Sequence, residues 1–108
     1  MSDTTIPIPL VMCFPTSDLA SRISAANKRV YVETLAVFIS PIMFDMCKVK
    51  SISYCYADEL FGVLMLKYGP EWWMKNVRLC NTTRHMSETI AKCVWTRYEE
   101  WKEKNNVA

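Results

Sequence analysis

The spacing of apolar and polar positions predicts three strands along the chain. Residues 5–13, TIPIPLVMC, are apolar and β-branched, but each of the two prolines removes a backbone donor. If this segment is a strand, we therefore expect either an edge strand or a strand that enters the sheet late, at about residues 10–14. The apolar segment 42–47, IMFDMC, predicts a short buried strand, and the alternation in 76–80, NVRLC, predicts a half-buried one.

Three helices are predicted between and after these strands. The first lies within residues 15–38, where apolar side chains recur at helical spacing. The second runs over about 56–68 and ends at Gly69 and Pro70, a pair that is typical of a helix end. The third spans about 83–104. For the first helix, the candidate N-caps are Thr16, Ser17 and Asp18, and the residues expected to face the core are Leu19, Ile23, Ala26, Val30 and Val37.

Alternating strands and helices of these lengths define the fold class. The order β-α-β-α-β-α predicts an α/β domain with right-handed crossovers between parallel strands. With 108 residues the chain has room for one core, so residues 1–108 are expected to form a single domain. We expect a small mixed, mainly parallel sheet of three to four strands, with the helices packed mainly on one face.

Composition narrows the class of partner. Apolar residues make up 51% of the chain, which argues against disorder, and the net charge of +2 comes from scattered residues, which disfavours nucleic acid. No apolar run reaches the roughly 20 residues that a bilayer span needs, and the N-terminal MSDTTIPIPL lacks the basic start of a signal peptide. We therefore expect a cytoplasmic protein with no membrane partner.

The chain has five cysteines and one histidine. The cysteines are odd in number, widely spaced and set in apolar stretches, as expected for thiols in a reducing compartment. With His85 alone no metal site is expected, and no phosphate-binding motif is present to hold a cofactor. Cys55 could act as a nucleophile only with His85 as its base, and a packed thiol is the simpler interpretation.

The adjacent carboxylates Asp58 and Glu59 raise the question of acid–base catalysis. Neighbouring positions on a helix point about 100° apart, so the two side chains do not converge on one substrate atom. In the first turn of the predicted second helix, both would face the positive end of the helix dipole. We interpret the pair as a helix start and expect no catalytic residue. Asp58 is then expected to be replaceable with little loss of stability.

Four tryptophans are many for a core of this size. Trp72 and Trp73 are neighbours and cannot point the same way in regular structure, so we expect one in the core and the other at the surface. Exposed aromatic side chains concentrate binding energy at protein interfaces. Trp73 is therefore a candidate contact residue, and the alternative is that it covers the end of the sheet.

Residues 45–62 read D-x-x-x-V-x-S-I-S-x-x-x-A-D-E-L-x-G and resemble the signature of the STAS-like family of small bacterial and phage domains. In that family an aspartate ends a buried strand, and S-F-A-D-E-L opens a helix. The likeness extends more loosely from Ser17 to the last helix, and Arg22 falls where the family often has an arginine. The resemblance implies a mixed sheet with packed helices, no cofactor and no catalysis.

Related STAS domains are antagonists of anti-sigma factors, and they dock on an ATPase-fold kinase through the loop and helix that match residues 51–64 here. In those relatives a serine at the helix start is phosphorylated, and the added charge breaks the complex. This chain has Cys55 at that position, which puts the phosphorylation in doubt and leaves the docking role. Ser51, Ser53 and Tyr54 are the hydroxyl residues nearby.

We therefore expect a non-catalytic protein–protein interaction domain, a regulatory antagonist that docks on a kinase or ATPase-fold regulator through the loop and helix at 54–64. The alternative is a small phage or mobile-element inhibitor that blocks a host enzyme or defence complex. A homodimer with a self-complementary apolar patch is a third interpretation. The residues predicted to contact the partner are Ser53, Tyr54, Cys55, Tyr56, Asp58, Glu59 and Trp73.

Overall fold

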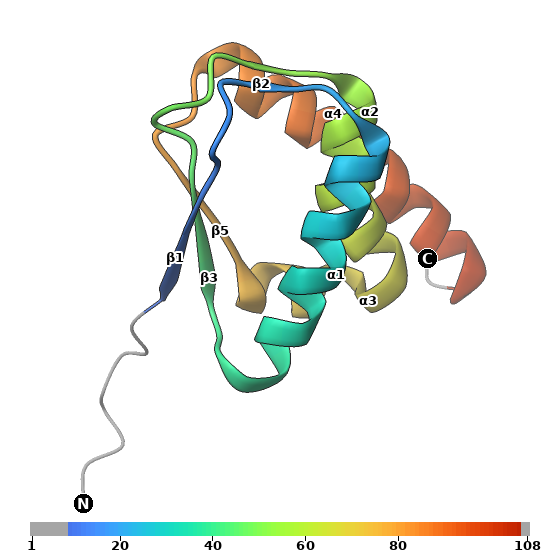
Figure 1. Ribbon diagram of the computed structural model, residues 1–108. Coiled ribbons are helices and arrows are strands. Elements are labelled where there is room, and N and C mark those ends of the chain that lie inside the picture. The colour runs from blue at the N-terminus through green and yellow to red at the C-terminus, as the bar shows by residue number, and fades with distance from the viewer. Residues whose placement is uncertain (1–8, 107–108) are drawn as a thin grey trace, which may run out of the picture.

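Three parallel strands form the main sheet of the protein (Figure 1). The structure, a computed structural model, describes residues 9–106. The strands β1 (Leu10–Cys13), β3 (Ile42–Asp45) and β5 (Val77–Cys80) lie in the order β1-β3-β5. β1 is an edge strand, as the sequence predicted, and the two other predicted strands are also present. The apolar β3 takes the centre, where it pairs on both sides.

Helices connect and follow the strands. α1 (Arg22–Phe38) lies between β1 and β3 in the chain, and α4 (Arg84–Lys104) follows β5. Between β3 and β5 the chain forms one nearly continuous helical stretch, made of α2 (Tyr54–Ala57), the π-helical turn η1 (Asp58–Gly62) and α3 (Val63–Asn76). The predicted α/β class, with a small and mainly parallel sheet, is confirmed.

Two very short strands precede α1 and α2. β2 (Asp18–Leu19) and β4 (Ser51–Ile52) pair in parallel and form a second, two-stranded sheet. The Ser51 hydroxyl donates a hydrogen bond to Asp18 at 2.6 Å. The predicted N-caps of α1 were therefore wrong, because Asp18 is part of a strand and Ser21 caps the helix instead. This pairing brings the N-terminal ends of α1 and α2 to the same end of the molecule (Figure 1).

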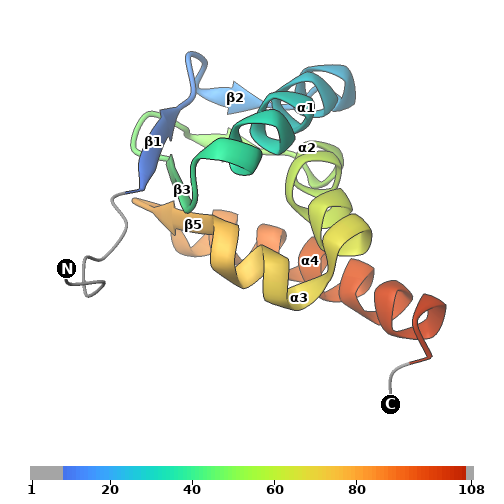
Figure 2. The same cartoon turned by 90° about the horizontal axis from the view of Figure 1, so that it is seen from below.

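The helices cover one face of the three-stranded sheet, as predicted, and Figure 2 shows the strands on one side of the helical layer. Every second residue along each strand points to the same face of the sheet, so the apolar residues of the three strands can gather on the face that the helices cover. On the open face Val11 is 56% exposed and Arg78 is also exposed. The residues that face the helices form two rows of register partners across the sheet. The first row is Leu10, Ile42 and Val77, and the second is Met12, Phe44 and Leu79.

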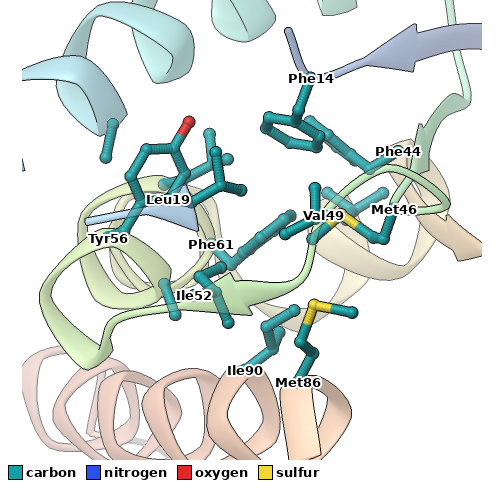
Figure 3. Packing of buried hydrophobic residues seen from close by; sticks show 14 of the residues in the cluster. Phe14, Leu19, Phe44, Met46, Val49, Ile52, Tyr56, Phe61, Met86 and Ile90 are labelled. Carbon is teal, nitrogen blue, oxygen red and sulfur yellow. The ribbon is translucent and has the colours of Figure 1, made fainter. Parts of the chain in front are cut away.

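Aromatic side chains fill the centre of the core (Figure 3). Phe44 of β3 packs edge-to-face on Phe61 of η1 with ring centroids 5.1 Å apart, and it stacks on Phe14 at 6.2 Å. Tyr56 of α2 meets the Phe14 ring edge-on at 6.4 Å, and Ile90 of α4, 2% exposed, closes the core from the other side. Each fully buried side chain of this kind contributes about 1.5–3 kcal/mol. The sheet, η1 and α4 are thus joined through one apolar centre.

The prediction of core residues for the first helix is wrong for three of its five members, whereas Leu19 is buried as expected and Ala26 is partly buried. Ile23, Val30 and Val37, which were expected in the core, are 76%, 57% and 76% exposed. Ala25 and Val32 face the core instead, at 0% and 1% exposed. α1 has two apolar stripes at helical spacing, and the stripe with the small Ala25 allows closer approach to the neighbouring helices. The stripe with the larger side chains is left on the surface.

The second predicted helix begins earlier than expected, and its predicted end at Gly69 and Pro70 is confirmed. It starts at Tyr54, and α3 (Val63–Asn76) consists of two helical segments that meet at Gly69. Gly69 has φ 86° and ψ 173°, so the chain kinks there, and Pro70 opens the next helical segment, where its missing N–H costs nothing. Gly69-Pro70 therefore ends the predicted helix, as expected, and a second helical segment follows directly. The kink is packed against the Trp101 ring of α4.

Replacing Gly69 with alanine should destabilise the protein by about 2–4 kcal/mol. A Cβ at this position would lie 2.8 Å from the Trp101 ring, and the positive φ is unfavourable for any residue with a side chain. Urea denaturation followed by tryptophan fluorescence gives the free energy of unfolding. The exposed change Lys92→Ala on α4 is the control and should stay within about 0.5 kcal/mol of the wild type. An unchanged midpoint for Gly69→Ala would contradict this account of the kink.

Candidate functional site

Ser53 positions the start of the predicted docking segment. Its hydroxyl accepts a hydrogen bond from the Tyr56 amide at 3.0 Å, which caps α2, and donates one to the Ala20 carbonyl at 3.0 Å. Ser53 rather than Cys55 therefore holds the N-terminus of this helix. Tyr54 is then left on the surface at 51% exposed and Cys55 is exposed too, whereas Tyr56 turns inward and is 3% exposed.

Asp58 forms a bidentate ion pair with Arg97 of α4. Arg97 Nε donates to Asp58 Oδ1 at 2.8 Å, and Arg97 Nη2 donates to Oδ2 at 2.7 Å. Arg22 Nη1 lies 3.4 Å from the same Oδ2. The Asp58 side chain is only 9% exposed, so these arginines replace the water that the carboxylate loses on folding. Asp58 is thus turned to the interior and away from the surface that a partner would contact.

Glu59 extends this pair into a chain of alternating charges. Its Oε1 accepts from Arg22 Nη1 at 2.9 Å, and its Oε2 accepts from Arg29 Nη2 at 3.1 Å. Arg29 also pairs with Glu33 at 2.6 Å, and Lys67 of α3 pairs with Glu33 at 2.7 Å. We call these side chains the ion-pair chain. In order, its members are Arg97, Asp58, Arg22, Glu59, Arg29, Glu33 and Lys67.

The ion-pair chain corrects the interpretation of Asp58 and Glu59 as a helix start. The helix begins at Tyr54, so both carboxylates lie beyond its first turn, where the effect of the helix dipole has fallen off. Their charge is balanced instead by arginines of α1 and α4. These partners are distant in sequence, so no local pattern could reveal them.

The arginines keep both carboxylates ionised at neutral pH. The hydrogen bonds from Arg97, helped by Arg22, hold the pKa of Asp58 below its ordinary value against the opposing effect of burial. Burial alone would raise the pKa of Glu59, but the hydrogen bonds from Arg22 and Arg29 outweigh it, and this pKa also lies below its ordinary value. A carboxylate with a lowered pKa is a poor proton donor near neutral pH. The two carboxylates are instead suited to holding α1 and α4 against η1 through ion pairs.

The π-helical turn makes room for the Asp58–Arg97 pair. A π turn adds one residue to the helical register and so changes which side chains face inward. Gly62 ends this turn, and a Cβ there would lie 2.7 Å from Asp58 Oδ1 and 3.0 Å from Arg97 Cγ. Only glycine leaves this space open. Leu60 and Phe61 in the same turn are 0% exposed, so the turn serves the core and the ion pair together.

Trp73 is held partly inside the protein. Its indole Nε1 donates to the Phe61 carbonyl at 3.0 Å, and its ring packs against the core. Trp72 is partly buried too and stacks on Tyr68 with ring centroids 4.4 Å apart. The prediction that one of this pair would be exposed is wrong, because α3 has neighbouring side chains over both faces. The exposed tryptophan is Trp95 of α4, at 61%.

The predicted contact residues therefore differ in what they offer to a partner. Only the exposed ones present a full side chain, so a contact surface has to extend beyond this segment. The neighbouring exposed group is Arg22 of α1, whose pKa is raised chiefly by the hydrogen bond that its guanidinium donates to Glu59. By exposure, the seven residues are Tyr54 and Cys55 at the surface, Ser53, Glu59 and Trp73 partly buried, and Tyr56 and Asp58 buried.

Helix α1 supplies the apolar surface that sequence reasoning had assigned to the core. A hollow of about 480 Å³ lies along its outer side, between α1 and Lys67 of α3. Val30, Val37 and Phe38 line this hollow, and they are 57%, 76% and 82% exposed. We call the exposed apolar side chains of the helix the α1 surface. Its members are Ile23, Val30, Tyr31, Val37 and Phe38.

The described part of the chain does not bring Cys55 and His85 together. His85 is exposed in the first turn of α4, whereas the charged group beside Cys55 is Arg22. Residues 9–106 contain no cluster of three or more histidine, cysteine, aspartate or glutamate side chains that could hold a metal ion. Over the same residues, no helix is both long enough and apolar enough to cross a bilayer.

Comparison with models of known protein families, with curated proteins and with solved structures found no match to this chain. The STAS-like resemblance of residues 45–62 therefore stays a prediction. The candidate site is defined by its own geometry. It consists of the α1 surface with Tyr54 and Cys55, and the ion-pair chain holds the helices beneath it.

Replacing Asp58 with asparagine should cost about 2–4 kcal/mol of stability. The change leaves Arg97, whose side chain is 24% exposed, without its charge partner. The burial and ion pairing of Asp58 thus predict a larger loss than the sequence alone suggested. The control is Glu99→Gln, which breaks a surface pair with Lys102 and should cost no more than about 1 kcal/mol. Equal losses for the two variants in urea denaturation would show that Asp58 has no special role.

The stability of the wild-type protein should fall as the pH is lowered below about 4. The pKa of Asp58 is lower in the folded protein than in the unfolded chain, so the unfolded chain binds the proton first and acid favours unfolding. Its contribution is complete above the ordinary pKa of an aspartate and is lost as the pH falls through the lowered one. Unfolding free energies measured across this range should decline less steeply for Asp58→Asn. Parallel curves would count against the ion pair.

Proposed function

We propose that this protein is a non-catalytic interaction domain that binds a partner protein through the α1 surface together with Tyr54 and Cys55. The observation that carries the proposal is that the large side chains of the α1 surface are all more than half exposed. Exposed apolar patches rimmed by polar residues are commonly binding sites. Three of these side chains line one hollow, so they form a connected patch.

The α1 surface has the shape of a helix-packing seam. Ile23, Val30 and Val37 are each one heptad apart and form a straight line along the helix. At 1.5 Å per residue this seam is about 21 Å long. The exposed positions between Ile23 and Phe38 are all uncharged, so a second helix could lie on them without burying an unpaired charge.

The charged rim of this surface indicates what the partner carries. Arg22 and Lys67 are 46% and 44% exposed at their side chains. The carboxylates that they pair with are far less exposed, at 9–16%. The border of the α1 surface is therefore electropositive, which favours a partner with carboxylates in that place. We infer that the occupant is an amphipathic helix with an apolar stripe flanked by aspartate or glutamate.

The ion-pair chain supports this role because it holds α1 in place before binding. A rigid surface loses less conformational entropy when a partner binds to it. Tyr54 and Cys55 extend the surface at its Arg22 end, in the segment whose STAS-like resemblance implies docking on an ATPase-fold regulator. Under this proposal the domain acts as a regulatory antagonist in the cytoplasm.

A small inhibitor from a phage or mobile element, which blocks a host enzyme or defence complex, is the second candidate. The observation that favours it concerns the hydroxyl groups at the start of α2. Cys55 stands where the STAS-like pattern would have a serine. The hydroxyl of the nearby Ser53 already accepts a hydrogen bond from the Tyr56 amide and donates one to the Ala20 carbonyl. A docking surface without a phosphorylated serine has no charge switch for release. Persistent binding of that kind suits an inhibitor.

Val30→Glu should weaken partner binding by at least about tenfold, because it places a charge in the centre of the seam. Val11→Glu is a closely matched control, since Val11 is 56% exposed and Val30 is 57% exposed, and Val11 lies on the open face of the sheet. Tagged wild type and both variants are used to purify partners from the source cell. The affinity for any protein retained by the wild type is then measured by calorimetry.

Retention by the wild type alone is not sufficient support. The proposal requires that Val30→Glu lose the partner while Val11→Glu keeps it, and that binding weaken as salt is raised. Equal affinity of the two variants would overturn it. If light scattering shows that the α1 surface binds only a second copy of the chain, the homodimer replaces the partner protein. A bound enzyme that loses activity would favour the inhibitor over the regulatory antagonist.

A further inference from the structure

A second hollow lies along the N-terminal half of α1, between this helix and the segment that joins β1 to β2. Its volume is about 560 Å³, within the range of small-molecule sites. Phe14, Leu19 and Tyr31 give it apolar and aromatic walls, and the first turns of α1 give it polar ones. None of the residues that line this hollow belongs to the ion-pair chain.

Tyr56 has a polar group in this hollow that the described protein does not satisfy. Its side chain is 3% exposed, and its hydroxyl has no hydrogen-bond partner among residues 9–106. Every side-chain nitrogen or oxygen of the described residues that is sealed from solvent does have a partner, so this hydroxyl must be open to the hollow. Figure 3 shows it directed away from Ile52 and Ile90. A tyrosine hydroxyl that opens into a hollow can donate or accept a hydrogen bond, and a ligand in the hollow can be its partner.

Lys28 contributes a positive charge to the same space. Its Nζ lies 3.4 Å from the Cys13 carbonyl and 5.0 Å from the centre of the Phe14 ring. Among the described residues it has no carboxylate within ion-pair distance. Asp18 also lines the hollow, but its two oxygens accept hydrogen bonds from the Ser51 and Ser17 hydroxyls. Lys28 is therefore the one positively charged side chain that lines the hollow, and Asp18 keeps its negative charge there.

The N-terminus of α1 adds to this positive field. Ala20, Ser21 and Ser24 line the hollow at the first turn of the helix, and Ser21 is its N-cap. The N-terminal end of a helix of this length has a partial positive charge and favours anions. Lys28 and Asp18 together carry no net charge, so they do not compensate the larger desolvation cost of a doubly charged anion. A carboxylate therefore fits this hollow better than a doubly charged phosphate.

We propose that this hollow binds a small aromatic carboxylate. The carboxylate lies between Lys28 and the first turn of α1, and the ring packs against Phe14 and Leu19. A polar substituent at the far end of the ligand exchanges a hydrogen bond with the Tyr56 hydroxyl. This site shares Tyr31 with the α1 surface, but the residues proposed to bind the polar groups of the ligand, Lys28 and Tyr56, do not belong to that surface.

The test uses 4-hydroxybenzoate as the probe and the amide NMR spectrum of the full chain as the readout. We expect saturable shifts at the residues that line the hollow, with a dissociation constant of about 1 mM or lower for a ligand of this size. The neutral 4-hydroxybenzamide has the same shape without the charge and should bind about tenfold more weakly. Lys28→Met should weaken 4-hydroxybenzoate by a similar factor.

Tyr56→Phe keeps the ring that packs on Phe14 and removes only the hydroxyl, so it should fold and bind 4-hydroxybenzoate about fivefold more weakly. The controls are Tyr54→Phe and Lys92→Met, which change exposed residues outside the hollow and should leave the affinity unchanged. If Tyr56→Phe fails to fold, the comparison of the two probes on the wild type still decides the matter.

The absence of saturable shifts at the hollow would overturn the proposal, as would equal affinity for the two probes. Inorganic phosphate that shifts the first turn of α1 as strongly as 4-hydroxybenzoate does would also overturn it, because the aromatic wall would then contribute nothing. Val30→Glu, the variant that tests the protein-binding function, should bind 4-hydroxybenzoate as the wild type does. Failure of one proposal can therefore be told apart from failure of the other.

Discussion

The bidentate pair between Asp58 and Arg97 determines how the three long helices are arranged. A carboxylate that is almost fully buried has to be paired, and Arg97 reaches it only when α4 lies against η1. Arg22 and Arg29 continue from the same place and bind Glu59, which sets α1 beside η1 as well. Ion pairs of this kind add little net stability, but an arrangement that separated them would leave charges unpaired in the interior. The apolar core supplies the stabilisation, and the ion-pair chain selects the packing.

Several elements of this fold could be predicted from the sequence because their patterns are local. The three strands of the sheet are short apolar or alternating segments, and the prolines near β1 indicated an edge. On α4, Met86, Ile90 and Cys93 recur at helical spacing and are buried as that spacing predicts. The alternation of strands and helices was then sufficient for the α/β class.

Other features depend on contacts across the fold and have no local signal. The buried stripe of α1 contains Arg29, and a charged side chain there is acceptable only because Glu59 and Glu33 lie opposite. The sequence pattern therefore favoured Ile23, Val30 and Val37 as the core, when they are exposed. Within the candidate site, the segment around Tyr54 could be singled out, but the burial of Tyr56 and Asp58 depends on the exact start of α2. Spacing alone does not define that start to one residue.

The parallel order of β1, β3 and β5 has a consequence for the growing chain on the ribosome. Each strand is separated from its neighbour in the sheet by roughly thirty residues that include a helix, so no hairpin can begin the sheet. Helical segments can form early from nearby contacts, whereas β3 keeps one open edge until β5 has been synthesised. Until that moment the central strand exposes unpaired backbone groups to other nascent chains. A delay in translation after β3 would lengthen that exposure and promote aggregation.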